Sequence, residues 1–478
     1  FPAAEFRKPY RRRRAALHLA YGKEVELRLA LPAELAPEVK RIAAPIADRA
    51  IDDLRDLVQR LGALQRVGFE VTVYPDAERY IEERLQQERL RRRAAAIRKD
   101  PAQHALRKNL LRAELLTYQL DGIAFAVGAG RAILADDMGL GKTIQAIGVA
   151  ELLAREAGIH RVLVVCPASV KTQWANEIAR FSARGARVVL GGAASRAEQY
   201  AEECFFTVCN YEQVLRDLLA IERAPWDLII LDEAQRIKNW EGKTSAVIKS
   251  LRSPFALALT GTPLENRIDD LYSVVEFVDD RRLAPAFRFY HRHRVTDETG
   301  KVLGYKNLDE LRERLAPVLL RRTRAAVLRE LPERTTEILR IPPTGEQLDL
   351  HGAHMRVISS IVTKPYINEM DLLRLRRALL ACRMCADGTA LVDKQAPGYS
   401  SKLERLDELL GQLTVEEARK IVLFSEWTGM LDLIEPLLAK HQVRFVRLDG
   451  SVPQKKRHAL VHEFQHDPRC KFFITTNA

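Results

Sequence analysis

Four short apolar runs between residues 161 and 262 form the clearest pattern of hydrophobic and polar positions in the chain. They are RVLVVCP (161–167), FFTVCN (205–210), DLIILDE (227–233) and FALALTGT (255–262). Runs of this length, rich in β-branched residues, are typical of strands buried on both faces of a parallel sheet. Amphipathic stretches separate them, as in 172–181, where Trp174, Ile178 and Phe181 share one helical face. The pattern predicts a doubly wound α/β domain that binds ligands at the carboxyl ends of its strands.

The pattern changes on either side of this domain. Residues 15–31 alternate apolar and polar side chains around Tyr21, which predicts a β-hairpin, and apolar residues at helical spacing predict a helix over 46–64. Residues 286–400 are rich in arginine and leucine and have a helical pattern. Apolar runs then resume at KIVLFSE (420–426), VRFVRLDG (443–450) and KFFITT (471–476). These later runs predict the strands of a second α/β domain.

We therefore expect four segments along the chain. Residues 1–110 form an N-terminal α+β accessory domain of unknown role, and residues 111–285 form the first α/β lobe. Residues 286–400 form a helical insertion and linker, and residues 401–478 form a second lobe. We expect this second lobe to be incomplete, because the chain stops directly after an apolar, strand-like run.

Charge and cysteine content narrow the class of protein. The chain has 76 lysine and arginine residues against 64 aspartate and glutamate residues, a formal net charge of +12, which favours a polyanionic partner such as nucleic acid. The densest basic stretches, YRRRR (10–14) and RLRRRAAAIRK (89–99), fit phosphate contacts and a solvent-facing surface equally well. No apolar run reaches the roughly 18 residues of a membrane span, and six irregularly spaced cysteines favour reduced thiols. We expect a cytoplasmic protein without membrane association.

The stretch ILADDMGLGKT (133–143) carries candidate phosphate-binding chemistry. A phosphate-binding loop curls backbone N–H groups around phosphate oxygens at a helix N-terminus, with a lysine to neutralise charge and a hydroxyl to bind magnesium. Gly139, Gly141, Lys142 and Thr143 supply these groups, but the general pattern G-x-x-x-x-G-K-[ST] requires glycine where this chain has Asp136. The predicted strand before the loop and the predicted helix after it stand in the order that the mechanism requires.

A pair of carboxylates follows the third apolar run. Asp232 is placed to hold magnesium, and Glu233 to orient or deprotonate the attacking water. An Asp-Glu pair after a strand is also common in ordinary surface turns. Its position about 90 residues after a phosphate loop in the same predicted sheet favours the catalytic interpretation.

Nine segments occur in the order found in a family of ATPases. They are LLTYQLDGIAFAV, ILADDMGLGKTIQ, VLVVCPASVKTQW, CNYEQVL, LIILDEAQRIKN, ALTGTPLENRIDDLYSVVEFV, LLRRTRAAVLRELPERT, KIVLFSEW and RLDGS. From about Leu111 to its end, the chain resembles Swi/Snf-type (Snf-two) ATPases of helicase superfamily two, and it looks closest to bacterial members. Aspartate is common in that family at the position of Asp136, so this residue does not count against the loop. The resemblance implies two RecA-like lobes.

The resemblance also implies roles for individual residues. The ATP-binding set would be Gln119, for the adenine edge, and the loop residues Asp136, Asp137, Met138, Gly139, Leu140, Gly141, Lys142 and Thr143. Thr143 and Asp232 would hold Mg²⁺, and the catalytic set would be Asp232, Glu233 and Gln235. Thr260, Gly261 and Thr262 would couple the nucleotide to lobe movement. Pro167 and Lys171 would lie near the DNA backbone, and the arginine-rich LLRRT (319–323) would brace one lobe against the other.

These implications lead us to expect a DNA-dependent ATPase. It would use ATP and Mg²⁺ to move on double-stranded DNA and to displace or remodel bound proteins such as a polymerase, in association with the nucleoid. Two alternatives are a helicase that separates DNA or RNA strands and a catalytically silent DNA-binding scaffold. Family members carry later arginines that reach the γ-phosphate, and such an arginine contributes on the order of a thousandfold to phosphoryl transfer. Because this chain ends before that motif, we expect it to hydrolyse ATP slowly.

Two short patterns raise the possibility of zinc. HEFQH (462–466) matches H-E-x-x-H, but Pro468 follows closely and no third ligand is near, which favours an ordinary second-lobe helix over a metalloprotease site. CRMC (382–385) has half of a zinc-knuckle spacing, which without a second pair favours reduced cysteines in a partly buried helix. We expect no zinc. We also expect Trp174 and Trp427 to be core residues and not base-stacking platforms.

Overall fold

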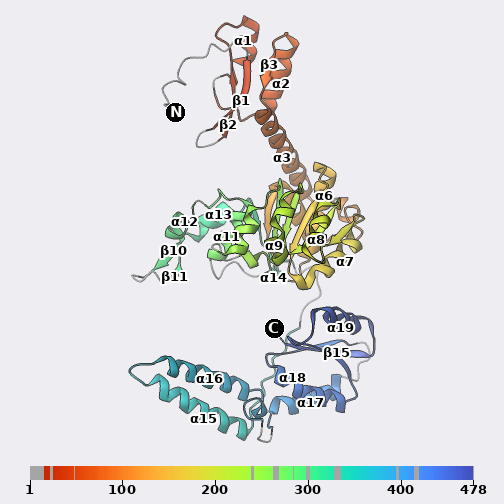
Figure 1. Cartoon of the computed structure of the whole chain (residues 1–478), viewed down its shortest axis with the longest axis vertical. Coiled ribbons are helices and arrows are strands. Elements are labelled where there is room, and N and C mark those ends of the chain that lie inside the picture. Colours follow the sequence, from red (N-terminus) through yellow and green to blue (C-terminus); the bar gives the residue numbers. More distant parts are fainter. Residues whose placement is uncertain are drawn as a thin grey trace. The chain divides into compact units, whose positions relative to one another are not determined.

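The computed structural model describes two compact units, Phe1–Glu333 and Arg334–Ala478 (Figure 1). The described residues are 15–21, 25–47, 49–237, 242–261, 268–283, 285–297, 302–327, 335–394, 398–413 and 419–476. Each unit contains a parallel sheet with helices packed on it, which confirms the predicted α/β class. The predicted segment boundaries at residues 110, 285 and 400 stay predictions.

A seven-stranded parallel sheet forms the centre of the first unit, in the order β12-β4-β9-β8-β5-β7-β6. Its strands are β4 (Arg131–Leu134), β5 (Val162–Cys166), β6 (Ala186–Val188), β7 (Phe206–Asn210), β8 (Leu228–Leu231), β9 (Phe255–Leu259) and β12 (Leu319–Leu320). All residues of β5, β8 and β9 are buried, as expected for strands covered on both faces. The four strands predicted from the apolar runs are therefore confirmed.

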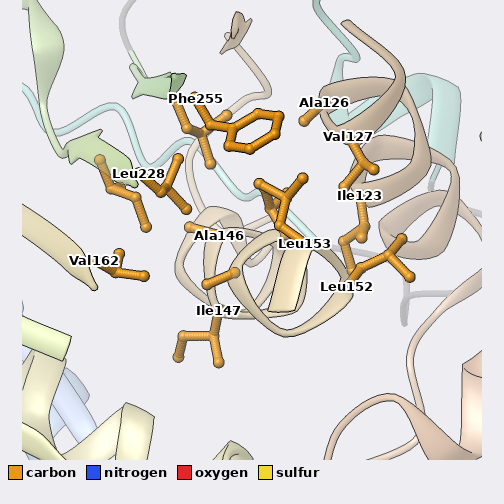
Figure 2. Packing of buried hydrophobic residues seen from close by; sticks show 14 of the residues in the cluster. Ile123, Ala126, Val127, Ala146, Ile147, Leu152, Leu153, Val162, Leu228 and Phe255 are labelled. Carbon is orange, nitrogen blue, oxygen red and sulfur yellow. The ribbon is translucent and has the colours of Figure 1, made fainter. Parts of the chain in front are cut away.

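Helices cover both faces of this sheet. The helices of this part of the unit are α4 (Leu106–Asn109), α5 (Thr117–Ala129), α6 (Lys142–Ala157), α7 (Lys171–Phe181), α8 (Ala193–Ala201), α9 (Tyr211–Glu222), α10 (Lys243–Ser250), α11 (Ile268–Val278), α12 (Ala286–His293), α13 (Leu308–Leu315) and the exposed α14 (Arg324–Val327), and β10 (Arg294–Thr296) and β11 (Val302–Tyr305) form a hairpin. Alternate strand residues enter opposite cores, so Val164 packs with α5 and α6 whereas Leu163 packs with α9 and α11. Figure 2 shows the first of these cores, with Leu152 of α6 beside Ile123 of α5.

A small α+β module precedes the large sheet. It contains β1 (Ala15–Tyr21), β2 (Val25–Ala30), β3 (Val71–Val73), α1 (Pro37–Ala43) and α2 (Leu54–Arg66). Strands β1 and β2 pair antiparallel, which confirms the predicted hairpin. The helix predicted over 46–64 was wrong at its start, because α2 begins only at Leu54. The Asp53 carboxylate caps it by accepting from the N–H groups of Arg55 and Asp56, both at 3.0 Å, and the Ile51 N–H donates to the Leu27 carbonyl of the hairpin.

The 25-residue helix α3 (Pro75–Lys99) joins this module to the sheet domain. Leu90, Ala94 and Ile97 belong to the same core as α5 and α6. Three arginines of the basic stretch 89–99 form ion pairs within the unit, Arg92 with Glu88 at 3.1 Å, Arg93 with Glu156 at 3.0 Å and Arg98 with Asp121 at 2.8 Å. The other basic stretch, YRRRR (10–14), lies outside the described residues.

The second unit is built on a three-stranded parallel sheet in the order β13-β15-β14. Its elements are α15 (Gly345–Val362), α16 (Glu369–Cys385), α17 (Ser401–Leu413), β13 (Ile421–Ser425), α18 (Thr428–Lys440), β14 (Arg444–Leu448), α19 (Gln454–His466) and β15 (Cys470–Thr476). The three predicted strands are confirmed. Cys382 and Cys385 are buried free thiols at the end of α16, and HEFQH ends α19, so both zinc-like patterns lie in helices as predicted. No helix within the described ranges combines the length and apolar character of a membrane crossing.

Candidate nucleotide-binding site

The predicted phosphate loop connects β4 to α6 at the carboxyl end of the sheet. Gly139 and Gly141 have φ angles of 85° and 71°, the left-handed region that glycine enters without a steric penalty. Gly141 also allows a close approach, since a Cβ added there would lie 2.7 Å from Nε2 of Gln119. The structure thus brings the predicted adenine-reading side chain against the loop. Met138 is largely exposed, and Leu140 is buried beneath the loop.

Lys142 places its ammonium group inside the curve of this loop. Its Nζ donates to the carbonyl oxygens of Asp136, at 2.7 Å, and Asp137, at 3.2 Å. Burial lowers the pKa of Lys142, and the nearby carboxylates of Glu233 and Asp136 oppose that shift. A Cβ added at Gly261 would lie 3.1 Å from the same Nζ, so this predicted coupling residue borders the lysine. A cation at a helix N-terminus is suited to neutralise phosphate.

The carboxylate of Asp232 is fixed by two donors directly after β8. Nε1 of Trp174 donates to Oδ2 at 2.8 Å, and the backbone N–H of Glu233 donates to Oδ1 at 3.0 Å. Burial raises the pKa of Asp232, and the hydrogen bond from Trp174 opposes the rise. Trp174 is 1% exposed, which confirms it as a core residue, but the sequence did not reveal its bond to the predicted metal ligand.

Glu233 and Gln235 form a chain of contacts toward the next strand. Glu233 has a φ of 51°, an unusual value for a residue with a side chain, and such conformations cluster at functional sites. Nε2 of Gln235 donates to the Glu233 carboxylate, and Oε1 of Gln235 accepts from the Thr260 hydroxyl at 3.1 Å. The predicted catalytic and coupling residues are therefore in contact through Gln235. Thr262 lies outside the described residues.

The side chains at this edge fit Mg²⁺ and ATP. Thr143 stands in the first turn of α6 and offers a hydroxyl, and Asp232 offers a carboxylate, which are the hard oxygen ligands that Mg²⁺ prefers. Lys142 and the N-terminus of α6 supply positive charge for phosphate oxygens. The site therefore joins groups for binding phosphate, metal and water on three neighbouring strands, β4, β9 and β8.

The side chain of Asp136, one of the predicted ATP-binding loop residues, points into the protein interior. Its side chain is fully buried, and its Oδ2 accepts from Nη2 of Arg322 at 2.6 Å and from Nε2 of Gln145 at 3.1 Å. The carboxylate supports the loop from within because these internal donors occupy it. Asp137 likewise accepts from the backbone N–H of Arg324 at 2.9 Å. The stretch LLRRT contains Arg322 and is followed by Arg324, but the sequence alone assigned neither arginine to the loop.

The predicted DNA-proximal residues Pro167 and Lys171 are both buried in this structure, and their contact with DNA stays a prediction. Pro167 is buried, and Lys171 is 8% exposed with its Nζ donating to the carbonyl of Val189 at 2.8 Å and to Gln213 at 3.1 Å. Burial lowers the pKa of Lys171. These acceptors engage two of the three N–H donors of the ammonium group. The exposed residues of this segment are Ala168 and Ser169.

Two protein families match the chain. The SNF2-related domain matches residues 118–385, and the helicase conserved C-terminal domain matches residues 401–478. These ranges include the loop, the Asp-Glu pair, the coupling segment and the second parallel sheet. The first match covers more than half of the chain.

Similar proteins come from animals and bacteria. The chain is 29% identical over 390 residues to a chromodomain-helicase-DNA-binding protein 1-like of Danio rerio, covering 76% of this chain and 37% of that protein. It is 29% identical over 364 residues to an uncharacterized ATP-dependent helicase of Mycoplasma pneumoniae, covering 74% of this chain and 34% of that protein. The chain thus spans about a third of the length of these relatives. Among solved structures, the SWI2/SNF2 ATPase core of Sulfolobus solfataricus in complex with dsDNA is 27% identical, with 77% of this chain and 78% of that chain covered and a TM-score of 0.44.

Proposed function

Because the chain belongs to the SNF2-related family of helicase-like ATPases, we propose that it is a DNA-dependent ATPase that translocates on double-stranded DNA and displaces or remodels bound proteins. The observation that carries the proposal is the convergence of Lys142, Asp232 and the Glu233–Gln235–Thr260 contacts at one edge of the sheet. Relatives with this family's name include a chromatin-regulating SWI/SNF-related protein of Homo sapiens, 29% identical over 386 residues. The name of that protein, a regulator of chromatin, supports protein remodelling as the outcome.

The proposed chemistry is carried by this chain's own groups. Lys142 and the N-terminus of α6 bind the phosphates, and Gly141 allows Gln119 to approach the base. Thr143 and Asp232 would hold Mg²⁺, which when bound would neutralise charge on the transferring phosphoryl group. Glu233 orients the attacking water and receives its proton, and Gln235 passes a change at Glu233 to Thr260. DNA attraction rests on the net charge of +12, so the proposed grip is on phosphates and sensitive to salt.

Two substitutions separate binding from hydrolysis. Lys142→Ala should abolish nucleotide binding, because it removes the cation inside the loop, whereas Glu233→Gln should keep binding and block hydrolysis. Equilibrium binding of a fluorescent ATP analogue and release of phosphate, each with and without DNA, measure the two steps. Equal loss of ATP affinity in both variants contradicts the assigned roles.

Motor activity has its own test. Displacement of a triplex-forming strand from duplex DNA reports translocation, and release of one strand of the duplex reports strand separation. We expect triplex displacement without strand separation. ATP hydrolysis that is indifferent to DNA would overturn the motor proposal.

A further inference from the structure

The buried carboxylate of Asp136 needs a cation, and it receives one from a distant part of the chain. Oδ1 accepts from the backbone N–H and from Nε of Arg322, each at 3.1 Å, and Oδ2 accepts from Nη2 of the same residue at 2.6 Å. Gln145 completes the group by donating to Oδ2 and accepting from Nη2 of Arg322 at 2.8 Å. A buried carboxylate without such partners is strongly unfavourable. The loop conformation around Asp136 therefore depends on Arg322.

The backbone that carries Arg322 is paired with the strand that enters the loop. Leu319 and Leu320 of β12 lie parallel to Ile133 and Leu134 of β4. The pairing continues past both strands, since the N–H of Ala135 donates to the Leu320 carbonyl at 2.8 Å and the N–H of Asp137 donates to the Arg322 carbonyl at 3.0 Å. The first half of the phosphate loop is thus held along its length by one segment.

Arg322 also contacts α5, the helix that carries Gln119. Its Nη1 donates to the Tyr118 carbonyl and lies 3.4 Å from the Asp121 carboxylate. This approach requires glycine at position 122, because a Cβ there would lie 2.5 Å from Nη2 of Arg322 and would collide with Gln145. One guanidinium group therefore joins the segment after β12, the phosphate loop and the start of α5.

We propose that Arg322 is a positioning residue of the nucleotide site. It holds the loop in its binding conformation through Asp136, and it links that loop to the segment from which the chain passes into the second unit after Glu333. The link to nucleotide affinity rests on the proposed ATPase function. The effect on loop order does not, because it follows from the hydrogen bonds alone.

The test compares Arg322→Gln with the double variant Asp136→Asn, Arg322→Gln. The single change leaves a buried carboxylate without its cation, so we expect nucleotide affinity to fall at least about tenfold. Hydrogen exchange of backbone amides 133–141 in the nucleotide-free chain should become faster. The double variant removes the uncompensated charge and should recover affinity to within about threefold of wild type. Gly122→Ala should reproduce the loss without a change of charge, because it displaces the guanidinium group.

Arg131→Gln is the matched control. Arg131 is a partly buried arginine at the opposite end of β4, and it donates to the carbonyl oxygens of Val278, Ser253 and Phe277 without touching the loop. This substitution should lower the melting temperature and leave nucleotide affinity unchanged in the folded protein.

The proposal is overturned if Arg322→Gln keeps the wild-type nucleotide affinity and the wild-type rate of amide hydrogen exchange. It is also overturned if the double variant binds nucleotide as weakly as the single variant. If Arg322→Gln does not fold, failure of the double variant to restore folding and binding also overturns it. A wild-type chain that binds no nucleotide would refute the proposed function, and the exchange measurement would still decide the role of Arg322.

Discussion

Replacement of Trp174 by phenylalanine tests how the Asp232 carboxylate is held. The change keeps an aromatic ring in the core and removes one donor, the indole N–H that lies 2.8 Å from Oδ2 of Asp232. A hydrogen bond to a charged group contributes about 1.5–3 kcal/mol, and the backbone N–H of Glu233 still fixes the other oxygen. If that energy orients the carboxylate toward Mg²⁺, its loss corresponds to an approximately 10- to 150-fold weaker response to the metal.

The assay is a magnesium titration of fluorescent ATP-analogue binding, repeated in a chelator. Trp174→Phe should need about 10- to 150-fold more Mg²⁺ for the same gain in affinity, whereas binding in the chelator, which depends on Lys142, should change little. Trp226→Phe is the matched control, because Trp226 is also buried and its Nε1 donates to the Ile221 carbonyl at 2.8 Å, away from the site. An unchanged magnesium response in Trp174→Phe, or an equal loss in both variants, would refute the reasoning.

Two further substitutions test the conformation of the loop glycine and the charge of a carboxylate in the second unit. Gly141→Ala should lose ATP binding, because its φ is 71° and the new Cβ would meet Gln119. The matched control is Gly158→Ala at the other end of α6, where φ is 70° and the space around the new Cβ is open, so this change should lower stability only. A thermal melt and a binding titration of both variants measure the two effects. In the second unit, hydrogen bonds from Ser451 and Arg447 lower the pKa of Asp449 to about 2. Because the pKa of this carboxyl group is lower in the folded chain than in the unfolded chain, where it is about 4, the group stabilises the fold above that pH. This stabilisation is lost as the pH falls toward about 2. Asp449→Asn should therefore lower the urea midpoint at neutral pH and flatten its decline between those values.

The strands and the phosphate loop could be predicted because their signals are local. Runs that are largely apolar identify β5, β7, β8 and β9, since strands covered on both faces contain few polar residues. The edge strands β6 and β12 are only three and two residues long, and none of their residues is fully buried. No apolar run therefore marks them in the sequence. The glycines and the lysine of the loop have fixed spacing, which makes that motif recognisable from the sequence alone.

The contacts that hold the site together could not be predicted because they depend on strand order. Trp174 follows β5 and reaches Asp232 after β8, and only the pairing of these strands brings the two together. Arg322 is 186 residues from Asp136, and its neighbour Arg321 has the same chemistry, so the sequence does not say which arginine enters the loop. The internal contact of Lys171 is of the same kind, because α7 begins at this residue and its Nζ reaches the carbonyl of Val189, which follows β6.

The long helix α3 belongs to two cores at once. Ala77 and Ile81 near its start are part of the N-terminal module, and Leu90, Ala94 and Ile97 near its end pack beside the ATP-binding sheet (Figure 1). At 1.5 Å per residue, its 25 residues extend over roughly 37 Å without an interruption that could bend. An unbroken helix of this length is a stiff spacer, so a ligand bound by the N-terminal module would be held at a set distance from the nucleotide-binding sheet.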